Sequence, residues 1–218
     1  MNTFQKYLSH FYRIVVEKTT SEYNSELIVA IQEGRYVLNT RNSNYSFASL
    51  HRVFQKALNK IEINNSKSIL LLGCGAGSIP TIIYKELGLN PQIDAVEIDE
   101  KVIALGNKYF GLNQYPNLNV VIDDAINFIE KTDNKYDIIL VDLFKGINVP
   151  EEFLKQYFFE SLKSLLKNNG EVLLNYVAYN YETKQQVLTI EKALESTFPQ
   201  SLKTYQLERI NRIFYVKK

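Results

Sequence analysis

The sequence contains no tryptophan, and only one cysteine, one methionine and two histidines occur among its 218 residues. The single cysteine, Cys74, cannot form an internal disulfide, which fits a reducing compartment, and a lone thiol cannot build a metal site. The two histidines, His10 and His51, lie far apart and outside any cluster of metal-ligating side chains. We therefore expect no metal centre, and we expect both histidines to be ordinary surface or interface residues.

The chain also lacks an excess of one charge, with 25 basic and 24 acidic residues. Because no basic block is present, a nucleic-acid partner is not expected. No apolar run approaches the roughly 20 residues that span a bilayer, so no membrane association is expected. Residues 1–13 lack the basic start and apolar centre of a secretion signal. These features favour a soluble protein of the cytoplasm.

Two kinds of hydrophobic pattern divide the chain. Residues 11–40 alternate between apolar and polar side chains, with a turn at Glu33–Gly34, which predicts a small antiparallel sheet. From Ala48 the apolar residues recur at helical spacing. We therefore assign residues 1–47 to a small N-terminal β-sheet region and residues 48–218 to a second domain.

Strands and helices alternate through this second domain. Apolar strands are expected at 68–72, 92–98, 118–122, 136–142 and 171–177, helices at 79–87, 99–110, 124–132, 150–167 and 181–198, and a terminal hairpin at 201–208 and 211–218. Apolar strands separated by amphipathic helices are typical of a parallel sheet covered on both faces. The prediction is an α/β fold with a Rossmann-like, doubly wound, mainly parallel seven-stranded sheet, an antiparallel C-terminal hairpin and the N-terminal antiparallel β-sheet before it.

A glycine-rich turn follows the first strand of this domain. Gly73, Gly75 and Gly77 alternate with Cys74 and Ala76, directly before an expected helix. Glycines at this position permit unusual dihedrals and let a ligand approach the backbone. A tight structural turn explains the same spacing, so the turn alone does not identify a site.

Two acidic residues make the interpretation of this turn as a ligand site more specific. Glu97 ends the second strand, 24 positions after Gly73, near the spacing at which an acid accepts hydrogen bonds from ribose hydroxyls. Asp124 follows the third strand, where its carboxylate could accept from an adenine amino group. The alternative for Asp123 or Asp124 is a helix cap, and Asp99 is most simply the N-cap of the next helix. Together, the turn, Glu97 and Asp124 predict an adenosine site.

These motifs resemble the successive motifs of spermidine synthases and their relatives within the class I S-adenosylmethionine-dependent methyltransferase fold. The resemblance extends from about Leu70 to Asn175 and is most specific in VEIDEKVIALGNKYF, residues 96–110. The small N-terminal β-domain is also similar to that family.

The resemblance implies a role for each matching residue. The glycine turn, with Gly73, Cys74, Gly75 and Gly77, would hold the amino-acid or aminopropyl end of S-adenosylmethionine or its decarboxylated form. Glu97 with Ile98 would hold the ribose, and Asp124 with Ala125 the adenine. Asp142, after the fourth strand, falls at the catalytic position and also lies beside the cofactor. Its alternative is a carboxylate that binds backbone NH groups of its own loop.

The departures from the family concern the polyamine. Spermidine synthases have an aspartate where this chain has Ala76, and a second aspartate where it has Lys145. The acidic stretch that lines their polyamine groove has no counterpart in residues 44–54. Because ammonium groups need carboxylate partners when they leave water, polyamine binding is disfavoured.

The acceptor side is expected at the ends of the fourth and fifth strands. Phe144, Asn175 and Tyr176 are the candidate substrate residues there, with Tyr179 and Tyr181 nearby, although fifteen tyrosines make packing roles common. The polar segment 39–46 is a candidate cover for the site, with Arg41 as a contact for a substrate anion. Cys74 is best interpreted as a small buried residue rather than a nucleophile.

Three functions remain open. The first is an S-adenosylmethionine-dependent methyltransferase acting on a small-molecule acceptor. The second is a polyamine aminopropyltransferase that uses decarboxylated S-adenosylmethionine. The third is a non-catalytic cofactor-binding module, because fold similarity alone does not establish activity. The aromatic segment 151–162 has more apolar residues than a solvated helix needs, which makes a homodimer a further hypothesis.

Overall fold

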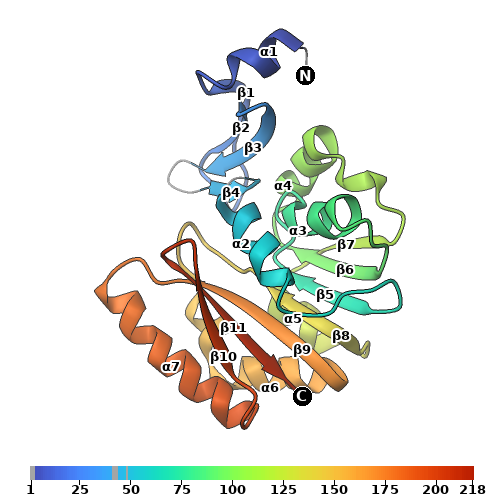
Figure 1. The fold of residues 1–218 in the computed structure, drawn as a ribbon, viewed down its shortest axis with the longest axis vertical. Helices are drawn as coiled ribbons and strands as arrows, with labels where there is room; N and C mark the ends of the chain where they lie inside the picture. The colour runs from blue at the N-terminus through green and yellow to red at the C-terminus, as the bar shows by residue number, and fades with distance from the viewer. Residues whose placement is uncertain (1–2, 41–43, 48) are drawn as a thin grey trace.

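A computed structural model describes residues 3–40, 44–47 and 49–218. A four-stranded sheet formed by the N-terminal part lies at one end of a larger seven-stranded sheet that carries helices on both faces (Figure 1). Helix α2, Ser49–Leu58, leads from the smaller sheet to the larger one (Figure 1). Among the helices of the described residues, none is long and apolar enough to cross a membrane.

The N-terminal sheet is antiparallel throughout. Its order is β1 (Ile14–Thr19), β2 (Leu27–Gln32), β3 (Arg35–Thr40) and β4 (Asn44–Ser46). The predicted turn between β2 and β3 is present, with Glu33 and Gly34 at φ of 50° and 75°, as a type I′ hairpin requires. The short helix α1, Thr3–Leu8, and strand β4 were not expected from the pattern. Both are very short, and β4 lies within the polar segment 39–46 that was expected to cover the site.

The large sheet confirms the predicted fold class. Its strands are β5 (Ser68–Leu72), β6 (Gln92–Glu97), β7 (Leu118–Ile122), β8 (Tyr136–Val141), β9 (Leu166–Val177), β10 (Lys203–Leu207) and β11 (Asn211–Lys217). They lie in the order β10-β11-β9-β8-β5-β6-β7, with β11 antiparallel to both neighbours. The direction of strand addition reverses at β5, so the turn after β5 lies at the switch point.

The helices begin close to the expected positions but are less regular than predicted. They are α3 (Ser78–Thr81) continuing as the π-helical η1 (Ile82–Glu86), α4 (Glu100–Leu105) continuing as the π-helical η2 (Gly106–Phe110), the 3-10 turn η3 (Leu112–Gln114), α5 (Ala125–Lys131), the 3-10 turn η4 (Glu151–Leu154), α6 (Gln156–Leu165) and α7 (Tyr181–Thr197). The two π-helical segments were not foreseen, because each is only five residues long and the residue pattern does not distinguish i→i+5 from i→i+4 hydrogen bonds over so short a span.

Alternate residues of the strands enter two separate cores. Leu70 and Leu72 of β5 face the cluster covered by α5, α6 and α7, whereas Ile69 and Leu71 face the cluster covered by α2 and α3. This division follows from the period of two along a strand. Helix α2 contributes four buried side chains to the second cluster, so it belongs to the packing of the large sheet: Val53, Phe54, Ala57 and Leu58.

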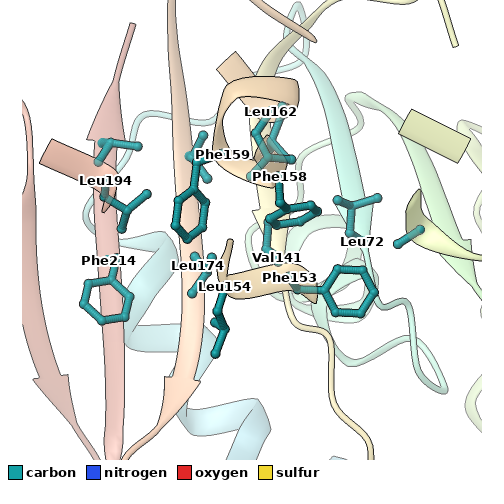
Figure 2. Close-up of a cluster of buried hydrophobic side chains, with 14 of the residues drawn as sticks. Leu72, Val141, Phe153, Leu154, Phe158, Phe159, Leu162, Leu174, Leu194 and Phe214 are labelled. Atoms are coloured by element: carbon teal, nitrogen blue, oxygen red, sulfur yellow. The ribbon is translucent and has the colours of Figure 1, made fainter. Parts of the chain in front are cut away.

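The segment 150–167 is not the single long helix that its pattern predicts. The chain is extended at Lys155, with φ −85° and ψ 153°, which separates η4 from α6, and β9 then begins at Leu166. Phe158 and Phe159 are fully buried against Leu174 of β9 and their neighbours (Figure 2). Most of the aromatic residues therefore fill the core, and the exposed apolar helix face on which the homodimer hypothesis rested is absent from this segment.

A third cluster joins the N-terminal sheet to the large domain. Leu27, Val29 and Leu38 of β2 and β3 pack with Ala76 of the glycine turn and with α4. Through this apolar cluster, the N-terminal sheet packs directly against the glycine turn at the switch point.

Candidate functional site

The glycine turn is held by the strands on both sides of it. The backbone N–H groups of Gly73 and Cys74 both donate to the carbonyl oxygen of Val96, each at 3.0 Å. Gly73 has φ +90°, and a Cβ atom there would clash with the carbonyl oxygen of Asp142. Only glycine allows this approach, so Gly73 closes the gap between the ends of β6 and β8.

Gly77 has a structural role that differs from the predicted contact with a cofactor. Its φ is +96°, and a Cβ atom there would meet Leu112 Cδ1 at 2.5 Å. Leu112 also packs near Gly106 at the start of η2. Gly77 is absent from the described residues that line the pocket introduced below. Its role is to allow the backbone conformation of the turn and its packing against Leu112.

Substitution of Gly77 by alanine should mainly reduce stability. The left-handed dihedral and the displacement of Leu112 together should lower the free energy of unfolding by about 2 kcal/mol. Denaturant titration measures this change. Nucleoside affinity, corrected for the folded fraction, should stay within about threefold of wild type, and a larger loss would show that Gly77 acts directly on the ligand.

Glu97 is turned toward the glycine turn and is almost completely buried, with 5% of its surface exposed. Its Oε2 accepts from the N–H of Gly75 at 2.8 Å, and its Oε1 accepts from the N–H of Asp99 at 3.1 Å. Burial raises the pKa of Glu97, although these backbone hydrogen bonds oppose the effect. A carboxylate offers about four acceptor positions, so Glu97 retains capacity for the hydroxyl groups of a ligand.

Asp99 confirms the predicted N-cap and has a further partner that the sequence did not reveal. Its Oδ1 accepts from the N–H groups of Lys101 and Val102 at the start of α4. Its Oδ2 accepts hydrogen bonds from the side chains of Ser21 and Asn24. The segment between β1 and β2 is thereby fastened beside Glu97, and nothing in its polar sequence indicated this long-range contact.

Asp124 serves as a helix cap and also lies at the pocket. Its Oδ1 accepts from the N–H groups of Ile126 and Asn127, at 2.8 and 3.3 Å. Asp123 accepts from the N–H of Asp124 and from Lys131. Of the two alternatives, the cap is therefore observed for Asp124, and its other oxygen carries no hydrogen bond among those found in the described part of the chain.

Asp142 is partly buried directly after β8, and its side chain begins a row of three hydrogen-bonded side chains that continues through Asn175 to Asn211. Asn175 donates from Nδ2 to Asp142 Oδ1 at 2.9 Å, and Asn211 donates from Nδ2 to Asn175 Oδ1 at 2.9 Å. Burial raises the pKa of Asp142 to about 7, the hydrogen bond from Asn175 opposes this, and the charge of Glu97 adds to it. The carboxylate of a residue with such a pKa can accept a proton near neutral pH.

These groups surround a single pocket of about 520 Å³. It contains every predicted cofactor residue except Gly77, including the half-exposed Ile98, and it contains Phe144 among the predicted substrate residues. Among the described residues, the pocket is lined by Tyr23, Asn24, Leu50, Gly73, Cys74, Gly75, Ser78, Ile79, Val96, Glu97, Ile98, Asp123, Asp124, Ala125, Asp142, Leu143, Phe144, Lys145, Gly146, Ile147, Pro150, Glu152, Phe153, Val177, Ile210 and Asn211.

The other predicted substrate residues have different surroundings. Asn175 lies outside the lining and hydrogen-bonds two residues that belong to it, Asp142 and Asn211. The Tyr176 side chain is buried in the core near α6 and α7, and its hydroxyl donates to Gln186 at 3.0 Å. Tyr179 donates to Asn148 outside the lining. Arg41 lies outside the described residues.

His51 is not the surface residue that the sequence analysis expected. It is 5% exposed on α2, with Nδ1 2.7 Å from Ser78 Oγ and Nε2 2.7 Å from Glu86 Oε1. Its partners come from α3 and η1, and the sequence pattern gave no sign of these contacts. Cys74 is buried, and burial raises the pKa of its thiol, so its thiol is a poor nucleophile.

The pocket fits an adenosine-containing ligand in its chemistry. Buried Glu97 supplies acceptors for hydroxyl groups, and Ala125 and Ile98 supply apolar contacts near Asp124. The described residues contain no group of three or more His, Cys, Asp or Glu side chains placed to hold a metal ion.

Comparison with known proteins supports this assignment. The spermine/spermidine synthase domain model matches residues 50–208. A mouse "eEF1A lysine and N-terminal methyltransferase" is 30% identical over 142 residues, 61% of this chain and 20% of the relative. A Vibrio vulnificus "polyamine aminopropyltransferase" is 34% identical over 110 residues, 49% of this chain and 36% of the relative. The chain thus matches only a fifth to about a third of these relatives.

A solved structure has the same fold. Human methyltransferase-like protein 13, crystallised in complex with SAH (S-adenosylhomocysteine), aligns with a TM-score of 0.62 and 25% identity. The alignment covers 78% of this chain and 82% of the human chain.

Proposed function

We propose that this chain, which belongs to the spermine/spermidine synthase domain family, is an S-adenosylmethionine-dependent methyltransferase. Glu97 would accept hydrogen bonds from the ribose, and Asp124 with Ala125 would lie beside the adenine. The turn from Gly73 to Gly75 would contact the rest of the cofactor. When bound, the cofactor supplies a methyl group that is already activated by its sulfonium.

The apolar surroundings of Ala76 favour methyl transfer over aminopropyl transfer. Ala76 is fully buried, and it packs against Leu27, Val29 and Leu38 of the N-terminal sheet. An aminopropyl ammonium at this point would meet an apolar wall and no carboxylate, which is costly. Lys145 lines the pocket and is exposed, so an ammonium group of a polyamine bound beside it would meet a like charge.

We propose an amine as the acceptor, carried by a small molecule. The names of both relatives describe amine acceptors, lysine and N-terminal amines in one and polyamines in the other. A protonated amine must lose its proton before it can attack a methyl group. Asp142 would receive this proton, and its hydrogen bond from Asn175 supports this role because it holds one of the carboxylate oxygens in position. Phe144 and Ile147 supply apolar contacts at the mouth.

Calorimetry tests the donor directly. We expect the purified chain to bind S-adenosylmethionine and SAH in the micromolar range, and to bind decarboxylated S-adenosylmethionine more weakly. Tighter binding of the decarboxylated form, together with release of methylthioadenosine in the presence of putrescine, would instead establish an aminopropyltransferase. If none of these nucleosides bound, the proposed function would be contradicted. Binding of a nucleoside without transfer to amines or to protein would indicate a non-catalytic cofactor-binding module.

A further inference from the structure

A polar chain of side chains leads away from the pocket at Ser78. Ser78 lines the pocket and is 3% exposed, and its hydroxyl is 2.7 Å from His51 Nδ1. His51 Nε2 lies 2.7 Å from Glu86 Oε1, and Gln55 Nε2 donates to the other oxygen of Glu86 at 2.7 Å. The adenosine assignment uses none of these four side chains.

Packing fixes the imidazole of His51. The ring of Phe47 stacks on it, with centroids 5.5 Å apart and an interplanar angle of 23°. Burial acts against ionisation of Glu86, but the hydrogen bonds from Gln55 and His51 outweigh it and lower the pKa of Glu86. Glu86 is therefore an ionised acceptor, and His51 Nε2 carries a proton that it donates to Glu86.

This arrangement leaves the Ser78 hydroxyl with two possible directions. When Nδ1 has no proton, the hydroxyl donates to it. When Nδ1 is protonated, the imidazolium donates to Ser78 Oγ, and the hydroxyl proton is free to point into the pocket. The second arrangement presents a hydroxyl donor to an acceptor in the pocket, while Nε2 keeps its contact with Glu86.

The pocket otherwise offers little to an anion. Glu97, Asp123, Asp124, Asp142 and Glu152 are acidic, and Lys145 is the only basic residue in the described lining. An anionic group bound within this lining needs a donor supported by a positive charge. Among the lining residues on the glycine turn and α3, Ser78 is the one whose side chain contacts a histidine.

The order of the strands indicates which end of a nucleoside ligand reaches Ser78. Asp124 follows β7, Glu97 follows β6, and Ser78 follows β5, and these strands are consecutive in the sheet. Neighbouring strands lie about 4.8 Å apart, so β5 is about 10 Å from β7. With the adenine at β7 and the ribose at β6, the chain attached to the ribose extends toward the β5 turn.

We propose that Ser78, supported by His51 and Glu86, binds the carboxylate at the amino-acid end of the methyl donor and thereby distinguishes S-adenosylmethionine from its decarboxylated form. This inference rests on the proposed function, because it assumes an adenosine ligand at Glu97. Ser78 acts here as a specificity residue, and His51 and Glu86 act as positioning residues.

The test compares two ligands that differ only in the carboxylate, SAH and decarboxylated SAH. Calorimetry should show that wild type binds SAH at least about tenfold more tightly, as a hydrogen bond to a charged group predicts. In Ser78→Ala, SAH affinity should fall roughly tenfold or more, while affinity for decarboxylated SAH should change less than about threefold. The variants His51→Asn and Glu86→Gln should lose SAH affinity in the same selective manner.

Two controls keep this test decisive. Ser161→Ala removes a serine hydroxyl whose partner is the Tyr157 carbonyl on α6, and it should bind both ligands like wild type. If His51→Asn does not fold, Ser78→Ala still decides the question, because it removes one oxygen atom only. Equal losses for the two ligands, or no loss for SAH, would overturn the carboxylate assignment. Failure of wild type to bind either ligand would instead contradict the proposed function.

Discussion

Substitution of Asp142 by asparagine should lower turnover at least about 100-fold and leave SAH affinity within about threefold of wild type. Removal of a general base costs roughly 10²–10⁴ in rate. The asparagine side chain keeps the carbonyl oxygen that accepts from Asn175 at 2.9 Å in the wild type, so the geometry should survive. The variant lacks only the ability to accept a proton from the acceptor amine.

The pH dependence separates this role from a structural one. Burial raises the pKa of Asp142 to about 7, so the wild-type rate at saturating substrates should rise as pH increases through about 7, where the carboxylate loses its proton. In Asp142→Asn this rise should disappear, and only the titration of the amine itself should remain. Single-turnover methyl transfer measured between pH 5.5 and 9 would show the difference.

A matched control is available in the same pocket. Asp123 lines the pocket and accepts from the N–H of Asp124, and Asp123→Asn preserves this acceptor. Its rate should stay within about fivefold of wild type. If Asp142→Asn lost binding and turnover in parallel, or kept a normal rate, Asp142 would not be the general base. Its role would then be structural, within its own loop.

The fold was predictable from sequence because its signals are local. Buried runs such as 68–72 and 136–142 are apolar on both faces, which is typical of a covered parallel strand. The break at Lys155 gave no comparable signal, since the residues on both sides continue a helical apolar pattern and no proline or glycine marks the boundary. Packing of Phe158 and Phe159 into the core decides the direction of α6.

The site was only partly predictable for a related reason. Glu97 and Asp142 follow strands, so their approach to the turn is a consequence of the topology. Asn175 and Tyr176 are neighbours on one strand, and successive side chains point to opposite faces. Asn175 therefore contacts Asp142, while Tyr176 enters the other core.

Contacts between distant segments could not be read from sequence. Asn211 reaches Asn175 because β11 returns beside β9, with Ile213 opposite Asn175 in the register. The hydrogen bonds from the side chains of Ser21 and Asn24 to Asp99 join residues more than 70 positions apart. Polar residues in such segments are common on any surface, so only the three-dimensional arrangement distinguishes the ones that reach the site.

Substitution of Glu97 by glutamine should reduce affinity for adenosine and for SAH by about 100-fold. In the wild type, the two carboxylate oxygens accept from the N–H groups of Gly75 and Asp99. A glutamine amide replaces one of these oxygens with a donor, so one backbone N–H would face another N–H. The ligand would also lose charge-assisted hydrogen bonds from its ribose, each worth about 1.5–3 kcal/mol.

Ligands lacking a hydroxyl show whether the lost affinity belongs to the ribose. Wild type should bind 2′-deoxyadenosine at least about tenfold more weakly than adenosine, while Glu97→Gln should bind the two almost equally, because its contact is already gone. Glu100→Gln, at an exposed position in the first turn of α4, is the matched control and should keep the wild-type preference. An undiminished preference for the hydroxyl in Glu97→Gln would assign the ribose to another residue.

The same variant should also change the titration of Asp142. Burial is the main cause that raises the pKa of Asp142, and the negative charge of Glu97 adds to it. Glutamine at position 97 removes that charge, so Asp142 should ionise at a lower pH, and the rise in the transfer rate at saturating donor should move to lower pH by the same amount. An unchanged profile would mean that the two carboxylates do not interact across the pocket, and the proton acceptor would then have to be sought elsewhere among its lining residues.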